Sequence, residues 1–223
     1  VGEGIAELIR PNTRLIFTES PGSLSFEVQD IPAITCVARA RGIPVALDNT
    51  WATPLYFKAF THGVDISIHA ATKYVVGHAD AMLGVINTTA AHYPVIKQTA
   101  VALGHCAGSE ECALGLRGLR TLDVRLARHQ ANALTLIDWL VARSEVRRAR
   151  YPAWPADPDH ALWQRDFRGA SGLFAVELSP CAPEALAAFV DGLQLFGLGY
   201  SWGGYESLLL PVHPEHSRSA TAW

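Results

Sequence analysis

The chain has 223 residues, of which 49% are hydrophobic and 17% are charged, a composition typical of a globular protein with a substantial core. Its formal net charge of -3 and its lack of a basic stripe argue against nucleic acids and anionic lipid surfaces as partners. Neither a run of about 18 apolar residues nor a secretion signal is present, so we expect a cytoplasmic protein without membrane contacts.

Short apolar runs alternate with helical segments along the first part of the chain. A helix is predicted over residues 31–41, because Asp30 can cap it, Pro32 lies in its first turn and Gly42 follows its end. Strands are predicted over residues 14–18, 44–48, 65–70 and 81–86. This alternation indicates an α/β domain with a mostly parallel sheet.

The second part of the chain has a different organisation. Leucine and alanine spacing over residues 110–148 predicts one or two long helices that lead out of the sheet, with the arginines near residue 148 exposed at their end. A small α+β unit should follow, with a strand, a helix and a second strand over residues 172–178, 183–193 and 208–210.

The cysteines predict packing rather than metal binding. They form no CxxC pair and have no zinc-like spacing, and their neighbours are mostly aliphatic, so we expect buried side chains and no metal site. The four are Cys36, Cys106, Cys112 and Cys181.

Polar residues follow three of the predicted strands, at Glu19, Asp48 and Thr72-Lys73. The carboxyl ends of parallel strands form a ligand crevice, so these segments should converge on one site. A lysine directly after a threonine, with an aspartate at the end of an earlier strand, suits pyridoxal 5'-phosphate. The Lys73 amine would form the covalent link, Thr72 would meet the phosphate, and Asp48 would keep the pyridine nitrogen protonated.

Simpler interpretations exist for each residue alone. Asp48 could cap the turn that follows it, Lys73 could be a surface cation at a strand end, and Thr72 could fill a strand position. The ordered set favours the cofactor site over these alternatives.

Five segments carry a family resemblance: Thr18–Val28, Asp48–Trp51, Ala71–His78, Arg117–Leu122 and Tyr200–Leu208. In this order they resemble the cysteine and methionine metabolism family of pyridoxal phosphate enzymes, which have fold type I. Within the family, Glu-Ser-Pro-Gly-Ser at 19–23 and Ser-Trp-Gly-Gly-Tyr-Glu-Ser at 201–207 are most similar to enzymes that β-eliminate cystathionine.

The resemblance implies an aspartate aminotransferase-like fold with an incomplete large domain over residues 1–118. A linker helix and a truncated C-terminal domain would occupy residues 119–223. It also implies that Ser23 replaces an asparagine that contacts the cofactor ring hydroxyl, and that Ser201 and Trp202 line the substrate pocket beside Lys73. Without the resemblance, Ser201 is equally well explained as a turn residue and Trp202 as a packed indole.

The implied activity is a carbon–sulfur lyase that converts L-cystathionine to homocysteine, pyruvate and ammonia. Full-length family members are expected to be homo-oligomers of the dimer-of-dimers type that act on a small amino-acid thioether. Two alternatives stay open: a catalytically silent fragment, and a γ-lyase or sulfhydrylase. The family often has a serine at the position of Ala70, and this hydroxyl is missing here.

Overall fold

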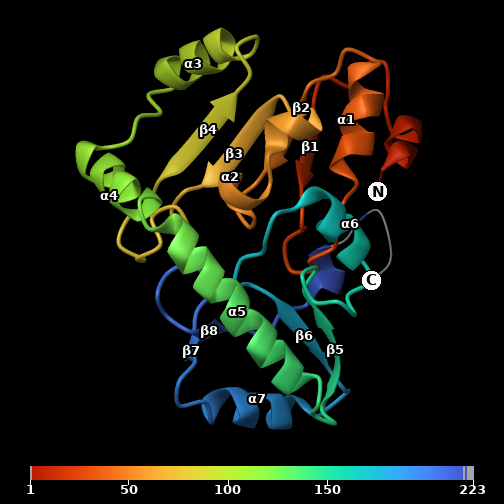
Figure 1. Cartoon of the computed structure of the whole chain (residues 1–223), viewed down its shortest axis with the longest axis vertical. Helices are drawn as coiled ribbons and strands as arrows, with labels where there is room; N and C mark the ends of the chain where they lie inside the picture. The colour runs from red at the N-terminus through yellow and green to blue at the C-terminus, as the bar shows by residue number, and fades with distance from the viewer. Residues whose placement is uncertain (1, 218, 220–223) are drawn as a thin grey trace.

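The computed structural model describes residues 2–217 and 219, and its main sheet has the strand order β1-β2-β3-β4 (Figure 1). Its first three strands are parallel, and the fourth is antiparallel to the third. The strands are β1 (Ile16–Glu19), β2 (Val45–Asp48), β3 (Ile66–Ala70) and β4 (Gly84–Thr88). This arrangement confirms the predicted α/β class with a mostly parallel sheet.

Helix α1 (Ile31–Arg39) covers one side of this sheet and begins as predicted, because the Asp30 carboxylate accepts a hydrogen bond from the Ala33 N–H at 3.0 Å. Its end lies two residues earlier than predicted. The chain turns through Gly42, whose φ of +66° is a left-handed conformation that glycine adopts without a steric penalty. Three short elements lie nearby: η1 (Glu3–Glu7), α2 (Thr53–Tyr56) and η2 (Ala59–His62).

The predicted helical stretch over residues 110–148 is divided into α4 (Ser109–Leu119) and α5 (Leu122–Leu140), and α5 carries the chain away from the sheet (Figure 1). The stretch ends early, since residues 146–150 form strand β5 (Val146–Arg150). The expectation of an exposed arginine group is therefore wrong at Arg150, which is only 5% exposed and donates to the Ser25 carbonyl at 3.2 Å.

The C-terminal part contains two small sheets. Strand β5 pairs antiparallel with β6 (Ala175–Leu178), and β7 (Gly197–Leu198) pairs parallel with β8 (Leu208–Leu209). The remaining elements are α3 (Tyr93–Ala102), α6 (His160–Asp166), α7 (Pro183–Asp191) and η3 (Pro214–Ser217).

One hydrophobic cluster extends from the main sheet into the C-terminal part. Trp51 packs edge-on against Tyr151, with ring centroids 6.1 Å apart, and its indole N–H donates to the Leu173 carbonyl at 2.9 Å. The Tyr151 hydroxyl in turn donates to the Ser171 carbonyl at 2.6 Å. These contacts fix the C-terminal part against the strand ends where the predicted site lies.

The molecular surface corrects the expectation for the cysteines, because all four are exposed. On α1 the inward positions are taken by Ile31, Ile34 and Ala38, and helical periodicity leaves Cys36 on the outer face. Among the described residues, no cluster of His, Cys, Asp or Glu suits a metal ion, and no helix is long and apolar enough to span a bilayer.

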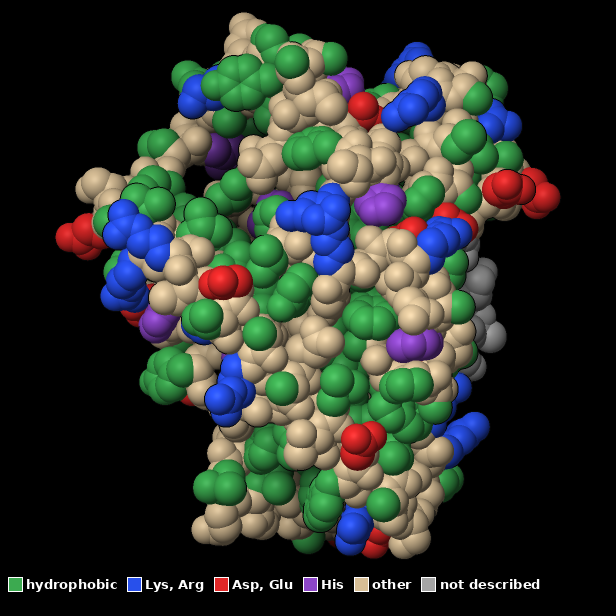
Figure 2. Space-filling model, in the orientation of Figure 1, with side chains coloured by type: hydrophobic (Ala, Val, Ile, Leu, Met, Phe, Trp, Pro, Cys, Tyr) green, Lys and Arg blue, Asp and Glu red, His purple; other side chains and the backbone are tan. Residues whose placement is uncertain are grey.

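Helix α3 buries none of its side chains. Hydrophobic side chains therefore gather on its surface at the top of the molecule, where Val95 and Val101 are 67% and 66% exposed (Figure 2).

Candidate active site

Lys73 lies in a turn just after β3 and faces residues from the far end of the chain. Its Nζ donates a hydrogen bond of 2.7 Å to Ser201 Oγ, across 128 positions of sequence, and lies 5.3 Å from the centroid of the Trp202 ring. Gly203 follows with a φ of +90°, and a Cβ on it would lie 2.9 Å from the Lys73 Cα. The structure therefore brings Ser201 and Trp202 beside Lys73, which is the placement that the family resemblance implied; their role in a substrate pocket stays a prediction.

The surroundings of Lys73 make its ammonium group easier to deprotonate. Burial lowers the pKa of Lys73 from the ordinary lysine value, because the charged ammonium loses part of its hydration. A lowered pKa is what an amine needs if it is to act as a nucleophile or base near neutral pH.

Asp48 ends strand β2 and is joined to the start of the Lys73 turn through Thr50. Its Oδ1 accepts from the Thr50 N–H at 2.9 Å and from the Thr50 hydroxyl at 2.5 Å, and that hydroxyl accepts from the Ala70 N–H at 2.8 Å. The simpler capping role considered for Asp48 is therefore real. The Asp48 carboxylate also lies at the end of β2, next to β3, the strand that leads into Lys73.

Glu19 is an acidic neighbour that the sequence analysis placed at this edge without giving it a role. It pairs in register with Asp48 across parallel strands, and the Ser23 hydroxyl donates to its Oε1 at 2.5 Å. Burial raises the pKa of Glu19, and the Asp48 charge acts in the same direction. Ser23 thus lies at the same sheet edge as Asp48.

The Thr72 hydroxyl is hydrogen-bonded to Leu83, the residue just before β4. It accepts from the Leu83 N–H at 2.8 Å and lies 3.3 Å from the Leu83 carbonyl oxygen. A phosphate contact from this hydroxyl stays a prediction, because it requires the weak contact to Leu83 to be exchanged for a phosphate oxygen.

Tyr74 forms a buried wall next to Lys73. Its ring lies 5.3 Å from the Trp202 ring, and its hydroxyl accepts from the Gly172 N–H at 3.1 Å. Leu122 and Leu126 from α5 complete this small cluster. The cluster packs against Trp202 and links the lysine turn to the C-terminal part.

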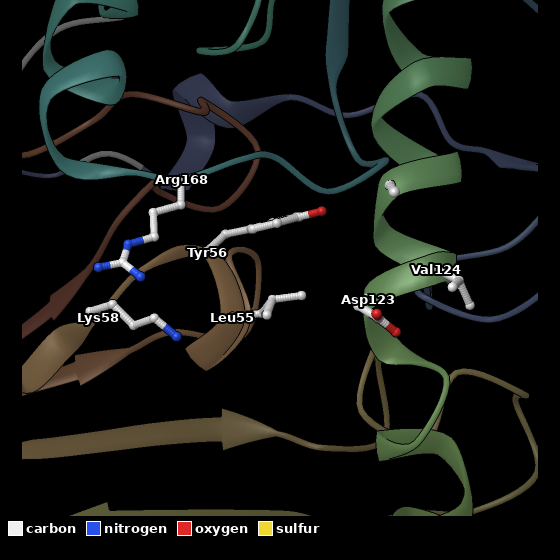
Figure 3. Close-up of a pocket in the computed structure, with 7 residues that line it drawn as sticks. Leu55, Tyr56, Lys58, Asp123, Val124 and Arg168 are labelled. Carbon is white, nitrogen blue, oxygen red and sulfur yellow. The ribbon is translucent and has the colours of Figure 1, made fainter.

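A hollow of about 470 Å³ opens between α2 and α5, and its labelled lining residues are shown in Figure 3. The Tyr56 ring extends toward α5, whereas Lys58 and Arg168 lie together on the α2 side. Burial raises the pKa of Tyr56, and the charge of Asp123 adds to this effect. None of the six predicted site residues lines this hollow, although Leu55 and Tyr56 pack against the same cluster as Trp202.

A family model described as Cys/Met metabolism PLP-dependent enzyme matches residues 1–221. The chain belongs to this family. The family's cofactor is pyridoxal phosphate, and the solved relatives have fold type I, in agreement with the sheet described above.

Individual relatives agree with this membership. The chain is 51% identical over 217 residues to a putative cystathionine beta-lyase of Rhizobium johnstonii, and 47% identical over 220 residues to cystathionine beta-lyase of Bordetella avium. These alignments cover 96% and 98% of this chain but 55% of each relative, so the chain spans about half the length of the curated relatives it matches.

Other relatives have different names. The chain is 41% identical over 211 residues to the L-alanine/L-glutamate racemase of Wolbachia pipientis wMel, covering 94% of this chain and 52% of that protein. A crystal structure of cystathionine gamma-lyase from Lactobacillus plantarum superposes with a TM-score of 0.86 at 32% identity, covering 92% of this chain and 53% of that one.

The residues present fit pyridoxal phosphate. A partly buried amine with a lowered pKa faces an indole, and the Asp48 carboxylate, a group of the kind that a protonated pyridine nitrogen requires, ends the strand next to the one that leads into that amine. Two features of the site had no signal in the sequence taken alone. The Thr50 hydroxyl bridge depends on strand register, and the contact of Gly203 with Lys73 depends on packing across distant segments.

Proposed function

We propose that this chain is the lysine-bearing part of a pyridoxal phosphate-dependent carbon–sulfur lyase that β-eliminates L-cystathionine to homocysteine, pyruvate and ammonia. The observation that carries the proposal is the hydrogen bond from Lys73 Nζ to Ser201 Oγ beside the Trp202 ring. It puts a reactive amine next to the two residues that the resemblance assigns to the substrate pocket.

Each residue has a distinct role in this proposal. Bound pyridoxal phosphate supplies the electron sink that makes the substrate Cα proton acidic. Asp48 would hold a proton on the ring nitrogen, and Lys73 Nζ would hold the cofactor and serve as the base for the Cα proton. Ser201 orients that amine, and Trp202 excludes water from one side of it. Thr72 and Ser23 are proposed to contact the phosphate and the ring hydroxyl.

Attachment of the cofactor can be tested at a single residue, since the chain has only three lysines: Lys58, Lys73 and Lys97. The protein is incubated with pyridoxal phosphate, the linkage is fixed by borohydride reduction, and peptides are mapped by mass spectrometry. We expect modification at Lys73, and its loss in Lys73→Arg but not in Lys58→Arg or Lys97→Arg. Equal labelling of all three lysines, or none, would favour the silent fragment.

Product identity tests the reaction itself. Cleavage of the Cβ–S bond of cystathionine releases pyruvate, whereas γ-cleavage releases 2-oxobutyrate. The racemase among the relatives adds a third outcome, conversion of L-alanine to D-alanine without release of a keto acid. Pyruvate alone supports the proposal, and either of the other products replaces it with a different reaction of the same site.

The location, the assembly and the division of the chain into units are also proposals. We expect the whole protein to act in the cytoplasm as a dimer of dimers, and the chain to divide into units at residues 1–118 and 119–223. Light scattering measures the assembly. Limited proteolysis tests the division, which requires preferred cleavage near the α4–α5 junction rather than in the loops of the small sheets.

A further inference from the structure

Arg125, on α5, lies against the turn that carries Lys73. Its Nη1 donates to the Tyr74 carbonyl at 2.7 Å, and its Nη2 donates to the Gly118 carbonyl at 2.8 Å and, more weakly, to the Val75 carbonyl at 3.4 Å. Its Nε donates to the Thr121 hydroxyl at 3.1 Å. One guanidinium therefore joins the residues just after Lys73 to the junction of α4 and α5.

Two glycines, Gly77 and Gly118, allow close packing around this guanidinium. Gly77 closes the turn with a φ of +72°, and a Cβ on it would overlap the Arg125 guanidinium. A Cβ on Gly118 would overlap the carbonyls of Val75 and Val76. The turn and α4 are thus packed at backbone distance, and the Arg125 guanidinium lies directly against the turn.

The turn itself fixes where the Lys73 side chain begins. The Gly77 N–H donates to the Lys73 carbonyl at 2.8 Å, and the Lys73 N–H donates to the Ala70 carbonyl at 3.0 Å. The carbonyls of residues 74 and 75 stay outside this pattern and are the ones that Arg125 binds. We infer that Arg125 is a positioning residue, which acts on the Lys73 amine through the turn and touches neither substrate nor cofactor.

Arginine is required here for its shape as well as its charge. A guanidinium presents a planar fork of donors, so one side chain reaches acceptors in three directions, whereas a lysine ammonium is a compact charge with a flexible stem. Arg125→Lys keeps the charge and should still release at least one carbonyl. Arg128→Lys, at an exposed position on the same helix, is the matched control.

The first measurement needs no cofactor. Hydrogen–deuterium exchange of the peptide spanning residues 71–78 should be about tenfold faster in Arg125→Lys, the factor expected for loss of a charge-assisted hydrogen bond. Arg128→Lys should leave exchange unchanged. Thr121→Ala keeps the contacts of Arg125 with the Tyr74, Val75 and Gly118 carbonyls and removes the Nε partner, together with the bond from the Thr121 hydroxyl to the Gly118 carbonyl at 3.2 Å. It should give a smaller increase, which keeps the inference testable if Arg125→Lys fails to fold.

The second measurement rests on the proposed function and uses the same borohydride mapping. Selectivity for Lys73 over Lys58 and Lys97 should fall about tenfold in Arg125→Lys and not in Arg128→Lys. The positioning role would be overturned if Arg125→Lys labelled Lys73 as selectively as the wild type does and its hydrogen–deuterium exchange were unchanged. Absence of Lys73 labelling in the wild type would overturn the proposed function instead, while the exchange result would still judge Arg125.

Discussion

Lys73 shows how burial sets the chemistry of a single side chain. Its pKa is lowered by desolvation, so its amine becomes neutral at a lower pH than an ordinary lysine. The rate at which an amine-reactive reagent modifies Lys73 can be measured at several pH values by peptide mapping. We predict that this rate reaches half its maximum at a lower pH than it does for a free lysine side chain. A midpoint at or above the value for free lysine would contradict this prediction.

At the residue scale, the sequence predicted Asp48 and Lys73 together because both follow apolar strands, and parallel strands bring their ends to one edge. Ser201 and Trp202 came only from resemblance, since no local pattern reports a contact across 128 positions. Arg125 gave no signal, because a partly buried arginine on a helix looks like a solvated one in sequence. The prediction for Arg150 is wrong for the same reason, because its burial depends on the loop between β1 and α1, where it binds the Ser25 carbonyl.

At the scale of elements, α4 tests the close packing beneath the lysine turn. Gly118→Ala should destabilise the protein by about 1–3 kcal/mol, because the added Cβ meets rigid carbonyls. Gly115→Ala on the same helix is the control, since its Cβ would meet only the flexible end of Leu83 and the substitution favours helix formation. Urea unfolding measures both, and equal effects would contradict the packing argument.

The start of α1 gives a pH prediction. Arg165 donates to both Asp30 oxygens, at 3.1 Å and 2.8 Å, and this lowers the pKa of Asp30. A lowered folded pKa stabilises the protein above the unfolded value of about 4, and the stabilisation is lost as the pH falls through the folded pKa.

Asp30→Asn keeps a capping oxygen but loses the charge, so its melting temperature should be below that of the wild type at pH 7 and approach it near pH 3. Asp30→Ala should cost about 1 kcal/mol more than Asp30→Asn at neutral pH. A difference between wild type and Asp30→Asn that persists unchanged into acid would show that the Arg165 pair contributes nothing.

At the scale of the whole molecule, apolar surface should govern solubility. Val95 and Val101 on α3 are both largely exposed, as are Phe17 on β1 and Ile86 on β4 at the two edges of the sheet. Exposed strands and apolar helices favour association, so we expect the isolated chain to aggregate.

The double substitution Val95→Lys and Val101→Lys should reduce light scattering at high concentration and change the free energy of unfolding by less than about 0.5 kcal/mol. The small change is expected because α3 buries no side chain. Unchanged scattering would place the associating surface elsewhere, with the sheet edges next to be tested.

The contact between Gly203 and the Lys73 backbone has a consequence for how the protein is made. During translation, Lys73 is synthesised 130 residues before Gly203, the glycine that lies against it in the folded protein. Until then the amine on a growing chain has neither its serine acceptor nor its indole neighbour. Binding of the coenzyme should therefore begin only after translation has passed Gly203. A nascent chain stalled before that point should bind the coenzyme no better than a free amino group does.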